Sequence, residues 1–108
     1  MCHCLACQKR TGSAFAIQAR WLAAQVTVEG DAKTYVRVGD EGSSATFRFC
    51  PTCGATVYWV NDTMADTIAV PVGAFADPTF PPPRISVYGV RKHPWVATTG
   101  LEMIEEID

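Results

Sequence analysis

Residues 45–60 read ATFRFCPTCGATVYWV, and this stretch decides the fold. Apolar, aromatic and β-branched residues dominate both residues 45–49 and residues 56–60, which predicts a strand on each side. The segment between them, Cys50-Pro51-Thr52-Cys53-Gly54, is a turn whose glycine lets the backbone tighten until its N–H groups point at sulfur. The stretch therefore predicts two strands joined by a turn that carries two thiols.

The rest of the chain repeats this pattern of short strands and turns. We expect strand-like segments at residues 13–20, 25–29, 34–38, 67–75 and 85–90. The other segments are expected to be a cysteine-rich loop (residues 1–12), a short helical turn (21–24), an irregular proline-rich stretch (77–83) and a short helix or frayed tail (101–108). Strands at roughly ten-residue spacing with turn signals between them predict a mainly β fold.

Length and composition narrow the class of protein. The 108 residues predict a single domain over residues 1–108. The chain is 48% hydrophobic and 19% charged, which excludes an intrinsically disordered class. No apolar run reaches the ~18–20 residues that span a bilayer, and no export signal is recognisable. We therefore expect no membrane partner and a cytoplasmic location.

The charge distribution bears on nucleic acids as partners. The net charge is −2, and residues 102–108 hold four of the eleven acidic residues. The remaining chain is close to neutral and has no basic stripe of the kind that nucleic-acid binding needs. We expect no nucleic-acid partner.

Five cysteines are an odd number, which does not suit a closed set of disulfides. Cys2, Cys4 and Cys7 lie within six residues, and Cys50 and Cys53 form the second group. In a reducing compartment, clustered thiols of this kind favour metal binding.

The pair Cys50 and Cys53 predicts a zinc knuckle, in which both thiolates bind one ion. Two alternatives stay open. The pair could be two buried structural thiols, or a thioredoxin-like redox pair, although a redox pair of that type precedes a helix and here a strand is expected to follow.

The first cluster admits two metal sites. If the segment is extended, Cys2 and Cys4 point to one side, and Cys7 returns to the same ion through a tight turn. Three thiolates leave one tetrahedral position open, as in a catalytic zinc site. Spacing alone favours the alternative, a closed structural site made of Cys4, Cys7, Cys50 and Cys53. A less favoured option is an iron–sulfur cluster on four of the five cysteines.

Two histidines need separate interpretations. The His3 side chain is expected to point away from Cys2 and Cys4, so we expect it in solvent or behind the ligands. His93 lies in Arg91-Lys92-His93-Pro94-Trp95. We expect either a surface loop with a packed tryptophan or, less favoured, a basic and aromatic border of a pocket for an anionic small molecule. Tyr58 and Trp59 are expected in or beside the core.

Three blocks together resemble the glutathione-dependent formaldehyde-activating enzyme family, which is related to the centromere protein V family. The blocks are CHCLACQKRTGSAF (residues 2–15), FCPTCG (residues 49–54) and HPW (residues 93–95). The resemblance runs from about residue 2 to residue 96. It implies a β-tent fold, a zinc ion on Cys2, Cys4 and Cys7 with an open position facing glutathione, and a second, structural zinc to which Cys50 and Cys53 contribute.

The resemblance also implies an activity: a carbon–sulfur lyase that condenses glutathione, or a related thiol, with formaldehyde or another aldehyde to S-hydroxymethylglutathione. Candidates to hold the carboxylates of the thiol substrate, chosen by charge alone, are Lys9, Arg10, Arg48, Arg91, Lys92 and His93. The alternative function is a non-catalytic zinc module, closed by four thiolates, that binds a thiol or a protein partner.

The sequence departs from the family at its start. Members usually carry an upstream strand with a C-x-C pair that completes the structural zinc site, and this chain begins at the triplet. We expect an N-terminal truncation of a longer domain. The alternative is that Cys50 and Cys53 share a metal ion with cysteines of the first cluster or of a second subunit. Without the upstream strand, an edge of the sheet has unpaired backbone groups, and a homodimer is one way to cover it.

Overall fold

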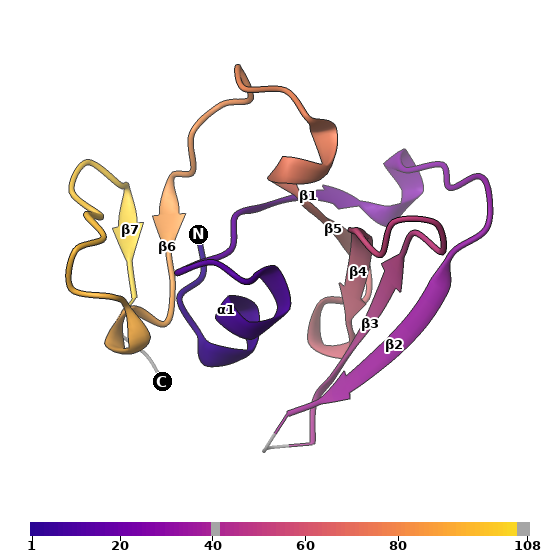
Figure 1. Cartoon of the computed structure of the whole chain (residues 1–108), viewed down its shortest axis with the longest axis horizontal. Helices are drawn as coiled ribbons and strands as arrows, with labels where there is room; N and C mark the ends of the chain where they lie inside the picture. The colour runs from indigo at the N-terminus through magenta and orange to yellow at the C-terminus, as the bar shows by residue number, and fades with distance from the viewer. Residues whose placement is uncertain (40–41, 106–108) are drawn as a thin grey trace. The chain divides into compact units, whose positions relative to one another are not determined.

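The computed structural model describes residues 1–39 and 42–105. The chain forms two compact units. The sheet unit is Ala19–Ala76, and the terminal unit combines Met1–Gln18 with Asp77–Asp108. Strands dominate the regular structure of the chain, as Figure 1 shows, so the expected mainly β fold class is confirmed.

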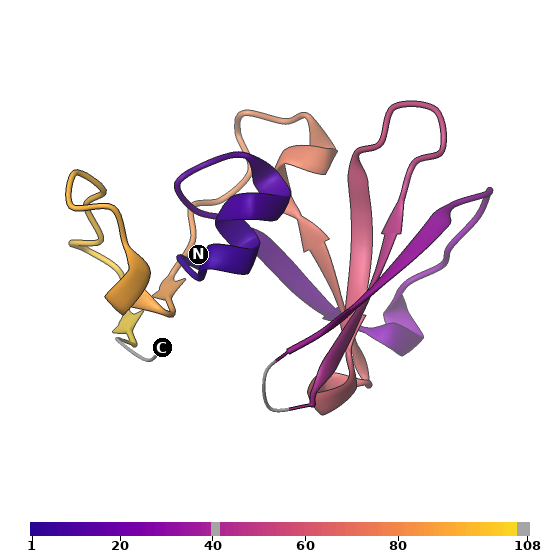
Figure 2. The same cartoon turned by 60° about the horizontal axis from the view of Figure 1, so that its bottom comes forward.

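The sheet unit is built on one five-stranded sheet with the order β1-β5-β4-β3-β2. Its strands are β1 (Gln18–Leu22), β2 (Lys33–Val38), β3 (Ser44–Phe49), β4 (Thr56–Asn61) and β5 (Thr67–Pro71). The pairs β2–β3, β3–β4 and β4–β5 are antiparallel. Figure 2 shows β3 and β4 joined by the loop of residues 50–55. The strands expected at residues 34–38, 45–49 and 56–60 are confirmed to within one residue at each end.

Side chains alternate between the two faces of each strand, and the buried apolar ones on one face form the core of this unit. Ala45 and Phe47 are buried on one face of β3, and Trp59 pairs with Phe47 across the β3–β4 ladder. The centroids of the two aromatic rings lie 5.4 Å apart. Ala69 pairs with Trp59 from the other side and is fully buried. The prediction that Trp59 lies in the core is confirmed, and Tyr58 beside it is half-buried.

Three expectations for the sheet unit need correction. Residues 25–29 form no strand, because Val28 is exposed and no neighbouring strand pairs with the segment among the described residues. The helical turn expected at residues 21–24 lies slightly later, as the 3-10 helix η1 (Ala23–Gln25). The strand expected over residues 67–75 ends at Pro71, where the chain turns into the 3-10 helix η3 (Val72–Phe75). A third 3-10 helix, η2, spans Asp62–Met64.

The terminal unit contains a helix where the sequence predicted a loop. Helix α1 spans Leu5–Thr11. The Cys4 side chain caps its N-terminus, and Gly12 ends it in a left-handed conformation with φ 67°, its N–H donating to the Gln8 carbonyl. A thiol thus takes the role that a serine hydroxyl usually has at a helix start, and glycine is the usual residue at a helix end of this type.

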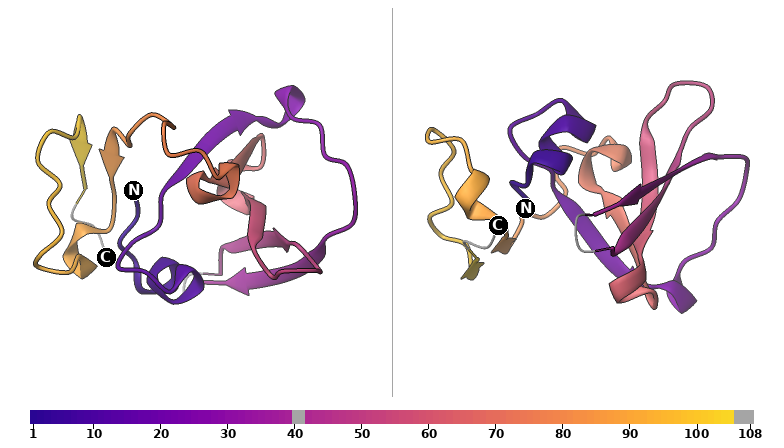
Figure 3. Two further views of the ribbon diagram at one scale, coloured as in Figure 1. Left: turned by 45° about the horizontal axis from the view of Figure 1, so that its top comes forward. Right: turned by 90° about the horizontal axis from the view of Figure 1, so that it is seen from below.

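Short parallel pairings complete the terminal unit. Strand β6 (Ile85–Ser86) pairs with β7 (Met103–Ile104), and the two lie side by side in both views of Figure 3. On the other side of β6, the Met1 nitrogen donates to the Ile85 carbonyl and the Val87 N–H donates to the Met1 carbonyl. The first residues of the chain therefore act as an additional strand beside β6.

Two expectations for the C-terminal part were wrong. The strand expected over residues 85–90 is shorter, because Tyr88 takes a left-handed conformation with φ 57° and the 3-10 helix η4 (Gly89–Arg91) follows. Residues 103–104 form β7, where we expected a helix or a frayed tail, and residues 106–108 of that expected element lie outside the described residues. Residues 77–83 are irregular, as expected. No helix within the described residues is long and apolar enough to cross a membrane.

Candidate metal centre

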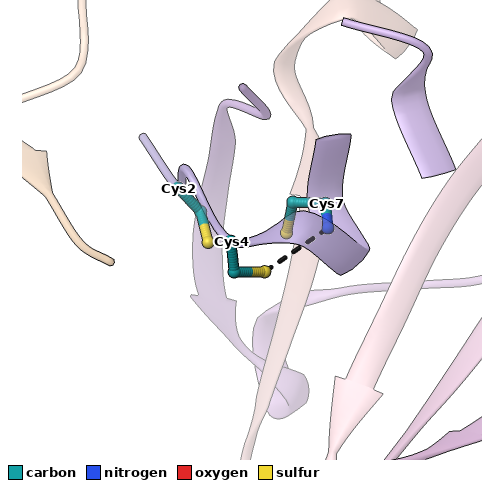
Figure 4. Close-up of side chains that lie close together, drawn as sticks. All are labelled: Cys2, Cys4 and Cys7. Carbon is teal, nitrogen blue, oxygen red and sulfur yellow. Dashed lines mark hydrogen bonds between the residues drawn. The ribbon is translucent and has the colours of Figure 1, made fainter. Parts of the chain in front are cut away.

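Three thiols of the terminal unit converge. The sulfur atoms of Cys2, Cys4 and Cys7 all lie within 4.8 Å of one another. Figure 4 shows Cys2 on the extended N-terminal segment, Cys4 at the start of α1 and Cys7 in its first turn, with the side chains facing one another. The structure thus brings together the three cysteines that the sequence grouped by spacing.

Backbone pairing on two sides holds Cys2 in place. Its N–H donates to the Ala16 carbonyl over 2.8 Å, and the Ala16 N–H donates back to the Cys2 carbonyl over 2.9 Å. On the opposite side, the N–H of the next residue, His3, donates to the Val87 carbonyl over 3.1 Å. Position 2 therefore does not fray in the way that an untied chain end would.

Helix geometry places Cys4 and Cys7 together. Residues i and i+3 share one face of a helix, and here residue i is the cap itself. The Cys7 N–H donates to the Cys4 sulfur over 3.4 Å, drawn as the dashed line in Figure 4. The expected tight turn that returns Cys7 to the cluster is therefore the first turn of α1.

The thiols affect one another's ionisation. The hydrogen bond with Cys4, then that with Cys7 and then burial raise the pKa of the Cys2 thiol far above its usual range. For Cys7, the hydrogen bond with Cys2 lowers the pKa, but the hydrogen bond with Cys4, burial and the charge of Cys4 together raise it. The nearby Arg10 guanidinium opposes that rise. Without a cation, Cys2 and Cys7 therefore favour the protonated thiol.

The donor set of this cluster fits a soft metal ion. All three side chains are cysteines, and Cys2 and Cys7 are buried while Cys4 is half-buried. Thiolates prefer zinc and related ions to hard cations such as Mg²⁺ and Ca²⁺. The cluster could therefore hold a metal ion. The alternative is the closed structural site of Cys4, Cys7, Cys50 and Cys53. It takes two cysteines from each unit, and it stays a prediction.

The second cysteine pair lies in the turn between β3 and β4. The Gly54 N–H donates to the Cys50 carbonyl over 2.8 Å, and Gly54 has φ 78°. The backbone N–H groups of Cys53 and then of Thr52 lower the pKa of the Cys50 thiol. These contacts are the sulfur-directed amides expected of a knuckle. Cys50 is half-buried and Cys53 is exposed, so the alternative of two buried structural thiols is wrong. A strand, β4, follows the pair, as the knuckle requires and the redox motif does not.

His3 does not lie in solvent, so that part of the expectation is wrong. Its side chain is fully buried, and its Nε2 lies 2.9 Å from the hydroxyl oxygen of Ser86, which is also fully buried. The Phe15 ring lies 6.0 Å away between centroids. His3 thus ties the metal-binding segment to β6.

Gln8 is a site residue that the sequence analysis missed. Its side-chain nitrogen donates to the carbonyls of His3 and Arg91, over 2.8 and 3.0 Å. Its side-chain oxygen lies 2.8 Å from the Nε2 atom of His93. The signal was present, because Gln8 is four residues after Cys4 and would share its face of a helix, but only if residues 5–11 were predicted as helical.

The segment that carries His93 is tied to α1 through this amide. The His93 ring packs edge-on against Trp95, with centroids 5.7 Å apart. Trp95 itself is 73% exposed, so the expectation of a packed tryptophan is wrong. The Lys92 ammonium donates to the Val96 carbonyl over 2.9 Å, which stiffens the segment.

The basic candidates fall in both units. Arg10, Arg91, Lys92 and His93 belong to the terminal unit with the thiol cluster, as does the exposed Lys9. Arg48 belongs to the sheet unit, where its guanidinium donates to the Thr34 hydroxyl. Arg10 has an electrostatic effect on one cluster thiol, that of Cys7.

Comparison with known proteins gives one family. The model of the family described as "Glutathione-dependent formaldehyde-activating enzyme" matches residues 1–91. The match includes both cysteine groups and ends before His93. No curated protein matches the chain. Because the matched region is most of the sequence, the chain belongs to the glutathione-dependent formaldehyde-activating enzyme family.

Proposed function

We propose that this protein is a zinc-dependent carbon–sulfur lyase that joins the thiol of glutathione, or of a related small thiol, to an aldehyde. The product with glutathione and formaldehyde is S-hydroxymethylglutathione. The observation that carries the proposal is the convergence of Cys2, Cys4 and Cys7 within the region that matches the family.

The proposed ligands of the reactive zinc are these three thiolates. A zinc ion held there would supply a positive charge that lowers the pKa of a substrate thiol and favours its thiolate. The chain's own groups would do the rest. Backbone pairing of Cys2 and the helix cap at Cys4 fix the ligands, and Arg10 adds positive charge beside Cys7.

We further propose that Cys50 and Cys53 hold a second, structural zinc. The amides directed at the Cys50 sulfur support this role, because they stabilise the thiolate that a metal ion needs. Cys53, being exposed, is accessible to ligands supplied from elsewhere.

Location and assembly are also proposals. All five cysteines are free thiols, which suits a reducing compartment such as the cytoplasm. A homodimer is supported by β2, which ends the sheet order and exposes Tyr35, Val36 and Val38. Sedimentation of the metal-loaded protein would measure the assembly state.

A second candidate function is the non-catalytic zinc module. Burial of Cys2 and Cys7 favours it, because substrates reach buried ligands less readily. The two candidate functions differ in the fourth ligand of the zinc ion. The lyase needs an exchangeable position, whereas the module needs four protein thiolates.

Metal content and two matched cysteine variants test these candidates. Zinc per chain is measured on protein purified without chelator, before and after glutathione is added. The lyase predicts that Cys7→Ser abolishes glutathione-dependent exchange of formaldehyde, followed by NMR, while the circular dichroism spectrum stays folded. The module predicts that Cys7→Ser and Cys50→Ser unfold the chain to the same extent, and that glutathione leaves the zinc unchanged.

A further inference from the structure

The Gln8 side chain has an orientation that its hydrogen bonds determine. One end of the amide faces two backbone carbonyls, those of His3 and Arg91. Carbonyls only accept hydrogen bonds, so this end must be the NH₂ group, which has two N–H donors. The other end, which faces His93, is therefore the amide oxygen.

This orientation determines the tautomer of His93. The Nε2 atom of its ring lies 2.8 Å from the Gln8 oxygen. Because that oxygen only accepts, Nε2 must carry the proton, and the lone pair of the neutral ring is on Nδ1. The described residues offer the ring no second hydrogen-bond partner, and the edge-on contact with Trp95 restrains it.

Helical spacing puts Gln8, the partner of His93, on the helix face of two of the thiols. Cys4, Cys7 and Gln8 occupy positions i, i+3 and i+4, which form one face of α1. Side chains of a helix lean toward its N-terminus, and Gln8 accordingly reaches back to the carbonyl of His3. The imidazole is thus hydrogen-bonded to a side chain on the helix face that presents two of the three thiols.

We propose that His93 transfers the proton in the reaction and that Gln8 is its positioning residue. This inference rests on the proposed function. Nδ1 takes the proton of the substrate thiol, and the sulfur forms a bond to the aldehyde carbon as the carbon–oxygen π pair moves to oxygen. The imidazolium then gives the same proton to that oxygen. The ring ends neutral, and no other reactant is consumed.

The tautomer is tested without measuring activity. Two-bond ¹⁵N–¹H correlation spectra of the zinc-loaded protein distinguish Nδ1–H from Nε2–H rings. We expect His93 as the Nε2–H tautomer, and Gln8→Met is expected to remove this preference while the fold is retained. An Nδ1–H ring in the unaltered protein would overturn the inference.

The proton transfer is tested with a variant that keeps the hydrogen bond. In His93→Gln, the new amide still donates to Gln8 but cannot take up a proton. We expect its turnover to fall by roughly 10²-fold or more, the usual contribution of a positioned acid–base group, with KM for the thiol little changed. In His93→Ala, added imidazole is expected to restore turnover. The control is Val90→Ala, an exposed position in η4, which should behave like the unaltered protein.

The possible failures are distinguishable. If the zinc-loaded, unaltered protein does not accelerate formaldehyde exchange, the proposed function itself is wrong. If it does, and His93→Gln keeps full turnover, the function stands and His93 is merely structural. The same conclusion follows if imidazole does not rescue His93→Ala.

Discussion

Two hydrogen bonds from Thr79 determine the ionisation of the exposed Asp77 carboxyl. Its carboxylate accepts hydrogen bonds from the Thr79 hydroxyl over 2.7 Å and from the Thr79 N–H over 2.9 Å. These two bonds, the hydroxyl first, hold the pKa of Asp77 below its usual value. They stabilise a turn in the proline-rich segment, where regular backbone pairing does not form.

This pKa shift predicts a pH dependence of stability. Because the pKa is lower in the folded state, the stabilisation is present above the unfolded pKa of about 3.9 and is lost as pH falls through the folded value. Asp77→Asn keeps an acceptor but removes the charge. We expect the variant to unfold at lower urea concentration than the unaltered protein at pH 7, and the gap to close as the pH falls through the folded pKa of Asp77. A gap that is constant with pH would contradict this account.

The left-handed backbone conformation of Ala76 allows a second prediction at the scale of single residues. Ala76 is exposed and has φ 49°, where it ends η3 with its N–H donating to the Gly73 carbonyl. A left-handed conformation costs a residue with a Cβ roughly 1–2 kcal/mol, and glycine largely avoids that cost. We expect Ala76→Gly to raise the free energy of unfolding by about 1 kcal/mol, measured by urea denaturation. The control Ala24→Gly, in η1 without positive φ, should lower it.

At the scale of elements, helix α1 combines two roles in one residue. Cys4 caps the helix and belongs to the thiol cluster. Serine at this position would still accept the Cys7 N–H, whereas alanine would not. The pair of substitutions therefore separates folding of the helix from metal binding.

We expect Cys4→Ser and Cys4→Ala to lose bound metal to the same extent, because each removes one of three thiolates. In the metal-free state, however, Cys4→Ala should be less stable than Cys4→Ser by about 1 kcal/mol. Metal content is measured by elemental analysis and stability by urea denaturation in chelator. Equal metal-free stabilities would show that the cap contributes nothing.

The elements also show what the sequence could predict. Strand β3 was predictable because the alternation of its side chains agrees with their burial. Strands β2 and β4 were predictable from their β-branched and aromatic residues, although β2 is almost wholly exposed. Helix α1 was not, since its seven residues are too few for a periodic pattern and its cap is a cysteine. The missed helix is also why Gln8 was missed. The buried contact between His3 and Ser86 joins residues 83 positions apart, and no local pattern predicts such a contact.

At the scale of the whole molecule, the two compact units raise the question of cooperativity. The sequence predicts a single domain, and we propose that the units unfold together. Each unit offers its own probe: the fully buried His3 in the terminal unit and the buried Trp59 in the sheet unit. For a single domain of this size, both should report one all-or-none transition.

Removing Trp59 tests that proposal. Its ring packs with Phe47 in the core of the sheet unit, and replacing a buried tryptophan with alanine costs about 3–5 kcal/mol. In a single domain, Trp59→Ala should move the urea midpoint of the His3 ring signal, followed by NMR, far down as well. The control Trp95→Ala removes an indole that is 73% exposed and should move it little. If the His3 midpoint ignores Trp59→Ala, the terminal unit folds on its own, and its thiol cluster would then keep its geometry without the sheet.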